Sequence, residues 1–178
     1  MKRTVLRYGA IGSLILIGVN VILLIILGIP ESGDYPYGEV IGYATIIVSL
    51  FPVFFAIRYY RDEHASGRLS FWKGLGVGSG VSILPSAAFA VYNWIYVTWL
   101  DPDFNEKYFA YAIEKARLEM SPAEFEAYSA QMQSQAALFA EPWFMAFVMF
   151  ATVFLIGVVI TIISALVLQK KQAAAHAE

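Results

Sequence analysis

One stretch without any charged residue, residues 74–100, limits what this chain can fold into more than any other feature. It is 27 residues long. Since a helix rises roughly 1.5 Å per residue, a stretch of this length can cross a hydrocarbon layer of about 30 Å. A lipid-facing surface does not need small side chains in register, whereas a helix that its neighbours approach closely does. The stretch predicts a central transmembrane helix, because small residues recur at every fourth position: Gly74, Gly78, Ser82, Ser86 and Ala90.

Three further long apolar runs accompany this stretch, and the chain as a whole is poor in charge. Only 15% of its residues are charged, compared with about 25% in a typical soluble domain. We therefore predict an all-α fold, an integral membrane bundle of four transmembrane helices that forms one domain over residues 1–178. The expected spans are residues 8–29, 40–60, 73–100 and 142–168. The first is expected to remain uncleaved, because its apolar run is longer than the roughly 7–15 residues of a signal peptide.

Residues 101–141 are the only sizeable polar part and are expected to form a helical hairpin between spans three and four. Asp101 followed by Pro102 predicts the N-cap and first turn of one helix. The sequence Ser121-Pro122-Ala123-Glu124 predicts the start of the second helix, because it is a capping box with proline at the first helical position.

Charge is distributed unequally between the two ends of the predicted spans. With four spans both termini lie on one side, and that side holds nine of the twelve basic residues. The other side holds three basic residues but eleven of the fourteen acidic ones. The positive-inside rule then predicts cytoplasmic N- and C-termini and an extracytoplasmic hairpin.

Several segments resemble a known family. They are GEVIGYATIIVSL from Gly38, FFAIRYYRDE from Phe54, LSFWKGLGVG from Leu69, PDFNEKY from Pro102 and IISALVLQKK from Ile162. They are similar to the DUF4199 family, small four-span bacterial membrane proteins of unknown function. The resemblance covers nearly the whole chain and implies a multi-pass protein of the bacterial plasma (inner) membrane. It offers no catalytic residues to carry over.

The residue types needed for common catalytic and metal sites are scarce. The chain has no cysteine, and its two histidines, His64 and His176, have no partner at metal-ligand spacing. The glycine run from Gly74 to Gly80 lacks the spacing of a nucleotide-binding loop. We predict no catalytic residue, cofactor, metal site or nucleic-acid partner.

Five polar residues are the candidates for a functional site. Glu39, Asp101 and Glu141 are expected at the outer ends of the spans, either as capping carboxylates or as a group that binds a cation or relays a proton. Asn20 and Asn93 are the deepest polar side chains, expected to form interhelical hydrogen bonds or, alternatively, to contact a ligand in a cavity.

A second set of candidates is basic. Arg58, Arg61, Arg68 and Lys73 are expected at the cytoplasmic ends of spans two and three. They are candidates for contacts with anionic lipid headgroups, at about 1 kcal/mol per charge. The alternative is that they only fix the topology.

The sequence supports three functional hypotheses. The favoured one is a non-enzymatic accessory or scaffold subunit of a membrane complex, embedded in the lipid bilayer, with a membrane-protein partner or a second copy of itself. The first alternative is a small oligomeric transporter or channel. The second alternative is a lipid-modifying enzyme with an outward carboxylate site at Glu39, Asp101 and Glu141.

Overall fold

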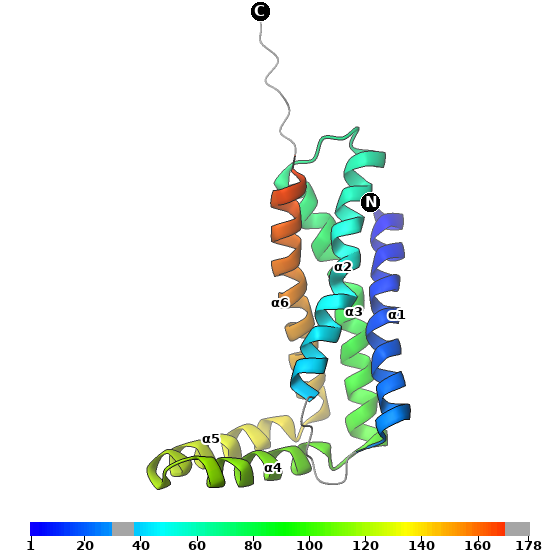
Figure 1. Cartoon of the computed structure of the whole chain (residues 1–178). Helices are drawn as coiled ribbons and strands as arrows, with labels where there is room; N and C mark the ends of the chain where they lie inside the picture. Colours follow the sequence, from blue (N-terminus) through cyan, green and yellow to red (C-terminus); the bar gives the residue numbers. More distant parts are fainter. Residues whose placement is uncertain (30–37, 170–178) are drawn as a thin grey trace, which may run out of the picture.

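A computed structural model describes residues 1–29 and 38–169, and these residues form helices without any β-strand (Figure 1). The chain contains six α-helices and one π-helix within those residues. In chain order they are α1 (Lys2–Leu27), α2 (Gly38–His64), α3 (Phe71–Ile95), the π-helix η1 (Tyr96–Leu100), α4 (Phe104–Glu119), α5 (Pro122–Phe139) and α6 (Pro142–Leu168).

Four of these helices are long and apolar enough to cross a membrane, which confirms the predicted all-α class and its four apolar helices. By length and composition they cover Lys2–Leu27, Val40–His64, Phe71–Leu100 and Pro142–Leu168. They lie side by side, with the start of α1 and the end of α6 at the same end (Figure 1). The shorter helices α4 and α5 lie across the other end and extend sideways from it (Figure 1).

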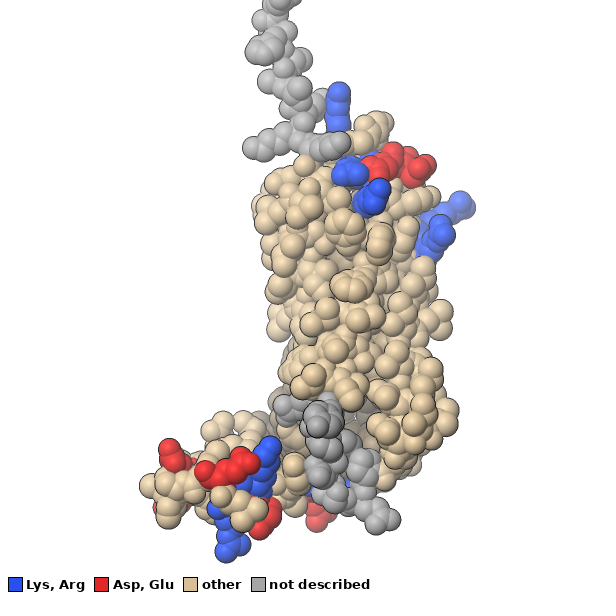
Figure 2. Space-filling model, in the orientation of Figure 1, with Lys and Arg blue, Asp and Glu red and all other residues tan. Residues whose placement is uncertain are grey.

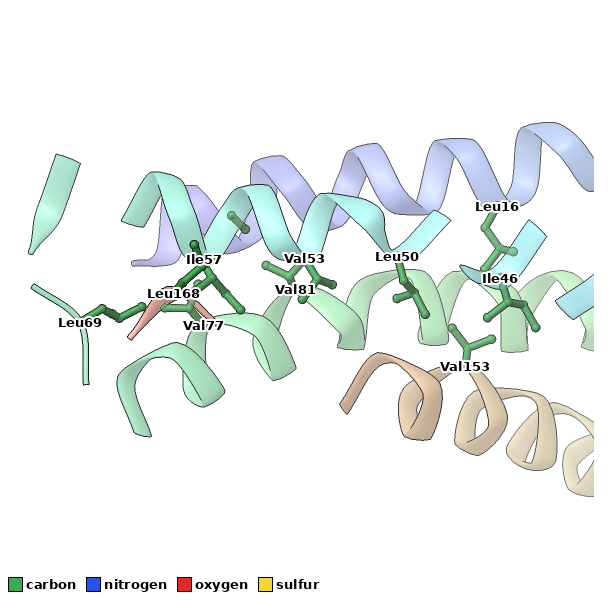
Figure 3. Close-up of a cluster of buried hydrophobic side chains, with 11 residues drawn as sticks. Leu16, Ile46, Leu50, Val53, Ile57, Leu69, Val77, Val81, Val153 and Leu168 are labelled. Atoms are coloured by element: carbon green, nitrogen blue, oxygen red, sulfur yellow. The ribbon is translucent and has the colours of Figure 1, made fainter. Parts of the chain in front are cut away.

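Helix α3 occupies the centre of this arrangement, as its pattern of small residues predicts. It packs most extensively against α6 and also contacts α1 and α2. The core consists of branched aliphatic side chains that meet between the long helices (Figure 3). Its members include Leu16, Ile46, Leu50, Val53, Ile57, Val77, Val81 and Val153.

Glycines set the close approach between α3 and α6. A Cβ atom on Gly78 would lie 2.6 Å from Oγ1 of Thr161. One on Gly157 would lie 2.6 Å from Cβ of Ser82. Because real Cβ atoms do not tolerate such distances, the two helices can approach this closely only with glycine at these positions. This packing by small residues is the main way that helices associate in membranes.

The structure corrects the expected start of the first hairpin helix. Asp101 and Pro102 precede α4, whose N-cap is Asp103. The Asp101 side chain is directed to Lys107 instead, with 2.6 Å between Oδ1 and Nζ. Its backbone carbonyl accepts a hydrogen bond from Phe104 N–H, so Asp101 closes the turn before the helix rather than capping it.

Helices α4 and α5 form the predicted pair between the third and fourth long helices, and they bury little. Only Phe109 and Ala116 are buried in α4, and no residue of α5 is buried. The pair contacts the long helices mainly through its base. Most side chains of this two-helix layer are therefore exposed or only partly buried.

Candidate functional site

The junction between α3 and α4 contains the one π-helix among the described residues. Helix α3 continues directly into η1, and the N–H of Asp101 donates to the carbonyl of Tyr96, five residues earlier, at 2.8 Å. A short π-helical turn widens the helix and changes which side chains point inward. Such turns are rare and occur frequently at functional sites.

Asp101 is the central residue of this junction. Its side chain is 3% exposed, and its Oδ1 accepts from the ammonium of Lys107 at 2.6 Å. Its second oxygen, Oδ2, is buried and has no hydrogen-bond partner, and the same is true of the Thr98 hydroxyl within η1. Because a buried oxygen without a partner is costly, the junction can accept a hydrogen bond from water or from a ligand. Sequence reasoning did not identify Thr98 or Lys107, because no local pattern marks them.

The base of the α4–α5 hairpin is fixed by one hydrogen bond and a chain of rings. Asn105 Nδ2 donates to the carbonyl oxygen of Phe139 at 2.6 Å. The ring of Phe139 lies 6.0 Å from Phe109 and 5.3 Å from Phe144 of α6. These contacts join α4, α5 and α6, so the hairpin is held at its base.

The far end of the hairpin has the predicted capping box. Glu124 Oε2 accepts from the Ser121 hydroxyl at 2.6 Å and from the Ser121 N–H at 3.1 Å. These two hydrogen bonds, the hydroxyl first, lower the pKa of the Glu124 carboxyl below its ordinary value. The charged form of Glu124 therefore stabilises the turn between α4 and α5.

The other two candidate carboxylates are not brought to Asp101 by any described contact. Glu141 is exposed and is the N-cap of α6, without a side-chain capping hydrogen bond. Glu39 lies in the first turn of α2, but its side chain is outside the described residues. An outward site of three carboxylates therefore stays a prediction.

The two candidate asparagines bond within their own helices. Asn20 Nδ2 donates to the carbonyl of Leu16 at 2.8 Å, and Asn93 Nδ2 to that of Phe89 at 3.0 Å. These bonds run to the preceding turn, and the interhelical bonds expected for the two side chains stay a prediction. The buried hydroxyls of Ser82 and Ser86 make the same kind of bond. Such bonds satisfy polar groups inside apolar surroundings, and they leave few groups free to face a ligand.

The candidate basic residues lie at the opposite end of the long helices from the hairpin (Figure 2). Arg61 donates to Asp62 from Nε at 2.7 Å and from Nη2 at 3.2 Å. Arg58 lies further from the same carboxylate, 3.8 Å from Nε to Oδ2. Arg68 and Lys73 follow in the loop and in the first turn of α3.

Metal-binding geometry is absent from the part of the chain that the structure describes. No group of three or more His, Cys, Asp or Glu side chains in residues 1–29 and 38–169 is placed to hold an ion. His64 stacks on the ring of Tyr60, with centroids 5.4 Å apart. His176 lies outside the described residues.

Comparison with known proteins gives one match. A family model described as "Protein of unknown function (DUF4199)" matches residues 7–170 of the 178. No curated protein and no solved structure matches the chain. The match begins at Arg7 within the first long apolar helix and covers the rest of that helix, the other three and the hairpin between the last two.

Proposed function

This chain belongs to the DUF4199 family, and we propose that it is a non-enzymatic accessory or scaffold subunit of a membrane complex. In this proposal the α4–α5 hairpin is the surface that a partner protein covers. The observation that carries it is the hairpin itself, a defined two-helix element with only Phe109 and Ala116 buried. A helix pair that buries so little gains little stability from its own packing, so a second surface is expected to complete it.

The four long helices would anchor the protein in the inner membrane of a bacterium. Their outer surfaces carry large exposed apolar side chains such as Leu14, Ile25 and Leu155, which lipid would cover. The basic residues near the start of α1 and the α2–α3 loop support a cytoplasmic location for that end. The hairpin would then lie on the extracytoplasmic side, along the membrane surface.

Charge indicates the chemistry of the partner. Residues 101–141 contain eight acidic and three basic residues. Within that range, residues 127–140 carry no charge, and they include the exposed Leu138. The three basic residues all lie on α4 and balance its three glutamates, whereas α5 carries Glu124 and Glu126 without a basic residue. A complementary partner would present basic side chains to the first half of α5 and an apolar surface to its second half. We therefore propose another membrane protein with a basic extracytoplasmic surface.

The fixed base of the hairpin supports a scaffold role rather than a loose tether. The Asp101–Lys107 pair ties α4 to the end of η1, and the Asn105–Phe139 bond ties α4 to α5. The ring contact between Phe139 and Phe144 joins α5 to α6. A rigid docking element costs less ordering entropy on binding than a flexible one. Transport is less well supported, because charged side chains gather at the two ends and leave the middle of the long helices uncharged (Figure 2).

Photo-crosslinking in living cells tests this proposal. A crosslinking amino acid replaces Leu118 or Leu138 in the full chain, expressed at its native level, and a matched control replaces the exposed Leu14 of α1. The expected result is one heavier protein adduct from both hairpin positions and none from Leu14. Adducts with lipid alone, or with a second copy of this chain alone, would contradict the accessory role.

A charge-reversal variant tests whether the partner surface is basic. Exchange of Glu126, which is exposed on α5, for lysine should reduce the adduct from Leu138 several-fold if the partner surface is basic. Exchange of the exposed Glu63 at the opposite end of the long helices provides the control and should leave the adduct unchanged.

A further inference from the structure

A groove runs between α2 and α6, from the middle of α2 toward the end of the long helices that lies away from the hairpin. Its volume is about 430 Å³, within the roughly 300–1,000 Å³ that is usual for ligand sites. Its lining is almost entirely apolar and consists of Phe51, Phe54, Phe55, Ile160, Ile163 and Ser164. Phe51, Phe55 and Ile163 are each more than half exposed, so the groove opens to the surroundings of the long helices.

An arginine continues the same face of α2 beyond the groove. Arg58 follows Phe55 by three residues and Phe54 by four, so the three side chains share one helical face. Its position is six residues before the end of α2 at His64, which corresponds to about 9 Å along the helix. Arg58 therefore lies above the groove, near the end of a helix that would cross the membrane, where lipid headgroups are found.

The cation of Arg58 is only loosely engaged by protein. Its side chain is 59% exposed, and its Nε lies 3.8 Å from Asp62 Oδ2. Asp62 is the carboxylate nearest to it, and Arg61 already holds that carboxylate by two shorter hydrogen bonds of 2.7 and 3.2 Å. Because Arg61 compensates the charge of Asp62, Arg58 keeps a guanidinium that can meet an anion. A planar guanidinium is well suited to phosphate oxygens.

We propose that this groove binds one anionic diacyl phospholipid from the leaflet at the basic end of the long helices. One acyl chain lies against Phe51, Phe55 and Ile163, and the headgroup phosphate lies on the Arg58 guanidinium. The apolar groove selects for a chain, and the arginine one turn further selects for a negative headgroup. This site is separate from the hairpin, so its occupancy does not depend on the accessory role.

Native mass spectrometry of the purified full chain tests the proposal directly. Delipidated protein in mild detergent is titrated with dioleoyl phosphatidylglycerol or with dioleoyl phosphatidylcholine, which share acyl chains and differ in net charge. We expect one phosphatidylglycerol per chain, bound about fivefold more tightly than phosphatidylcholine, the factor that corresponds to one arginine contact. Equal affinity for the two lipids would overturn the proposal.

Two pairs of variants locate the lipid. Arg58→Gln should abolish the preference for phosphatidylglycerol, while Arg68→Gln, a basic residue in the loop that follows α2, should keep it. Ile163→Trp should fill the groove and weaken the binding of both lipids. Leu166→Trp changes a residue at a similar depth on α6 that is similarly exposed but outside the groove lining, and it should leave the binding of both lipids unchanged.

Other occupants of the groove would give different outcomes. A second copy of the chain would appear as a dimer that Ile163→Trp dissociates, without a change in lipid affinity. That result would replace the lipid by a protein interface. Unchanged lipid binding in both Arg58→Gln and Ile163→Trp would place the lipid elsewhere on the surface and would also contradict the proposal.

Discussion

The ammonium of Lys107 lies 2.6 Å from Oδ1 of Asp101, in the turn where the third long helix gives way to the hairpin. The aspartate is buried, whereas the lysine side chain remains partly exposed. The pair therefore balances a charge that the protein has removed from water. It also links α4 to the end of η1, and together with the Asn105–Phe139 bond it orients the hairpin.

Replacement of Lys107 should lower the stability of the folded chain. Lys107→Met would leave the buried Asp101 carboxylate without its cation, and we expect a loss of about 3 kcal/mol of stability. Thermal unfolding of the detergent-solubilised chain measures it. Lys115→Met, an exposed lysine of the same helix, is the matched control and should change stability by less than about 0.5 kcal/mol. If the double variant with Asp101→Asn is no more stable than Lys107→Met alone, the charge is not the cause.

The approach of α3 to α6 provides a second prediction. Gly78→Ala should destabilise the protein by about 1–3 kcal/mol, because its new Cβ would lie 2.6 Å from Thr161 Oγ1 and force the helices apart. Gly76→Ala is the control, since a Cβ there meets nothing within 4 Å. Denaturation in detergent compares the two variants. Equal stability of the two alanine variants would show that the close approach of α3 to α6 does not contribute to the stability of the fold.

The helix interface at Gly78 shows which part of the packing the sequence alone can predict. Small residues every fourth position predict that Gly78 lies in a helix interface, because only a close neighbour needs them in register. The same pattern does not identify α6 as that neighbour, since the order of helices depends on contacts far apart in the sequence. The α2–α6 groove could not be predicted for the same reason.

Asp101 shows a different limit of sequence reasoning. An aspartate before a proline is a local signal for a helix start, and that signal is followed here by a turn and then by α4 at Phe104. The role of Asp101 depends instead on η1. The wider turn of η1 follows from a backbone hydrogen bond to Tyr96, and no residue type in the sequence predicts that bond. Asn20 and Asn93 show the same limit. Each side chain donates to the carbonyl one turn earlier in its own helix, and the residue type alone does not predict whether that carbonyl or a neighbouring helix is the partner.

The capping box gives a pH dependence for the hairpin. The pKa of Glu124 is lowered in the folded chain by the Ser121 hydroxyl and then by the Ser121 N–H. The stabilisation is therefore present above the ordinary pKa of a glutamate, about 4.3, and is lost as the pH falls through the lowered folded value. Amide hydrogen exchange in the first turn of α5 should become less protected over that range. Glu124→Gln should remove this dependence, whereas Glu126→Gln, an exposed neighbour, should preserve it.

The orientation of the chain can be measured with single cysteines, because the natural sequence contains none. The proposed topology places Ala130 of α5 outside the cell and Glu63 of α2 inside, and both residues are exposed. In intact cells a membrane-impermeant maleimide should label Ala130→Cys and should label Glu63→Cys only after the membrane is permeabilised. The physical reason is the unequal distribution of lysine and arginine, which favours retention of the basic end in the cytoplasm. The reverse labelling pattern would invert the topology and would move the proposed hairpin partner to the cytoplasm. The phospholipid groove would then face the outer leaflet, but its test with purified protein would be unaffected.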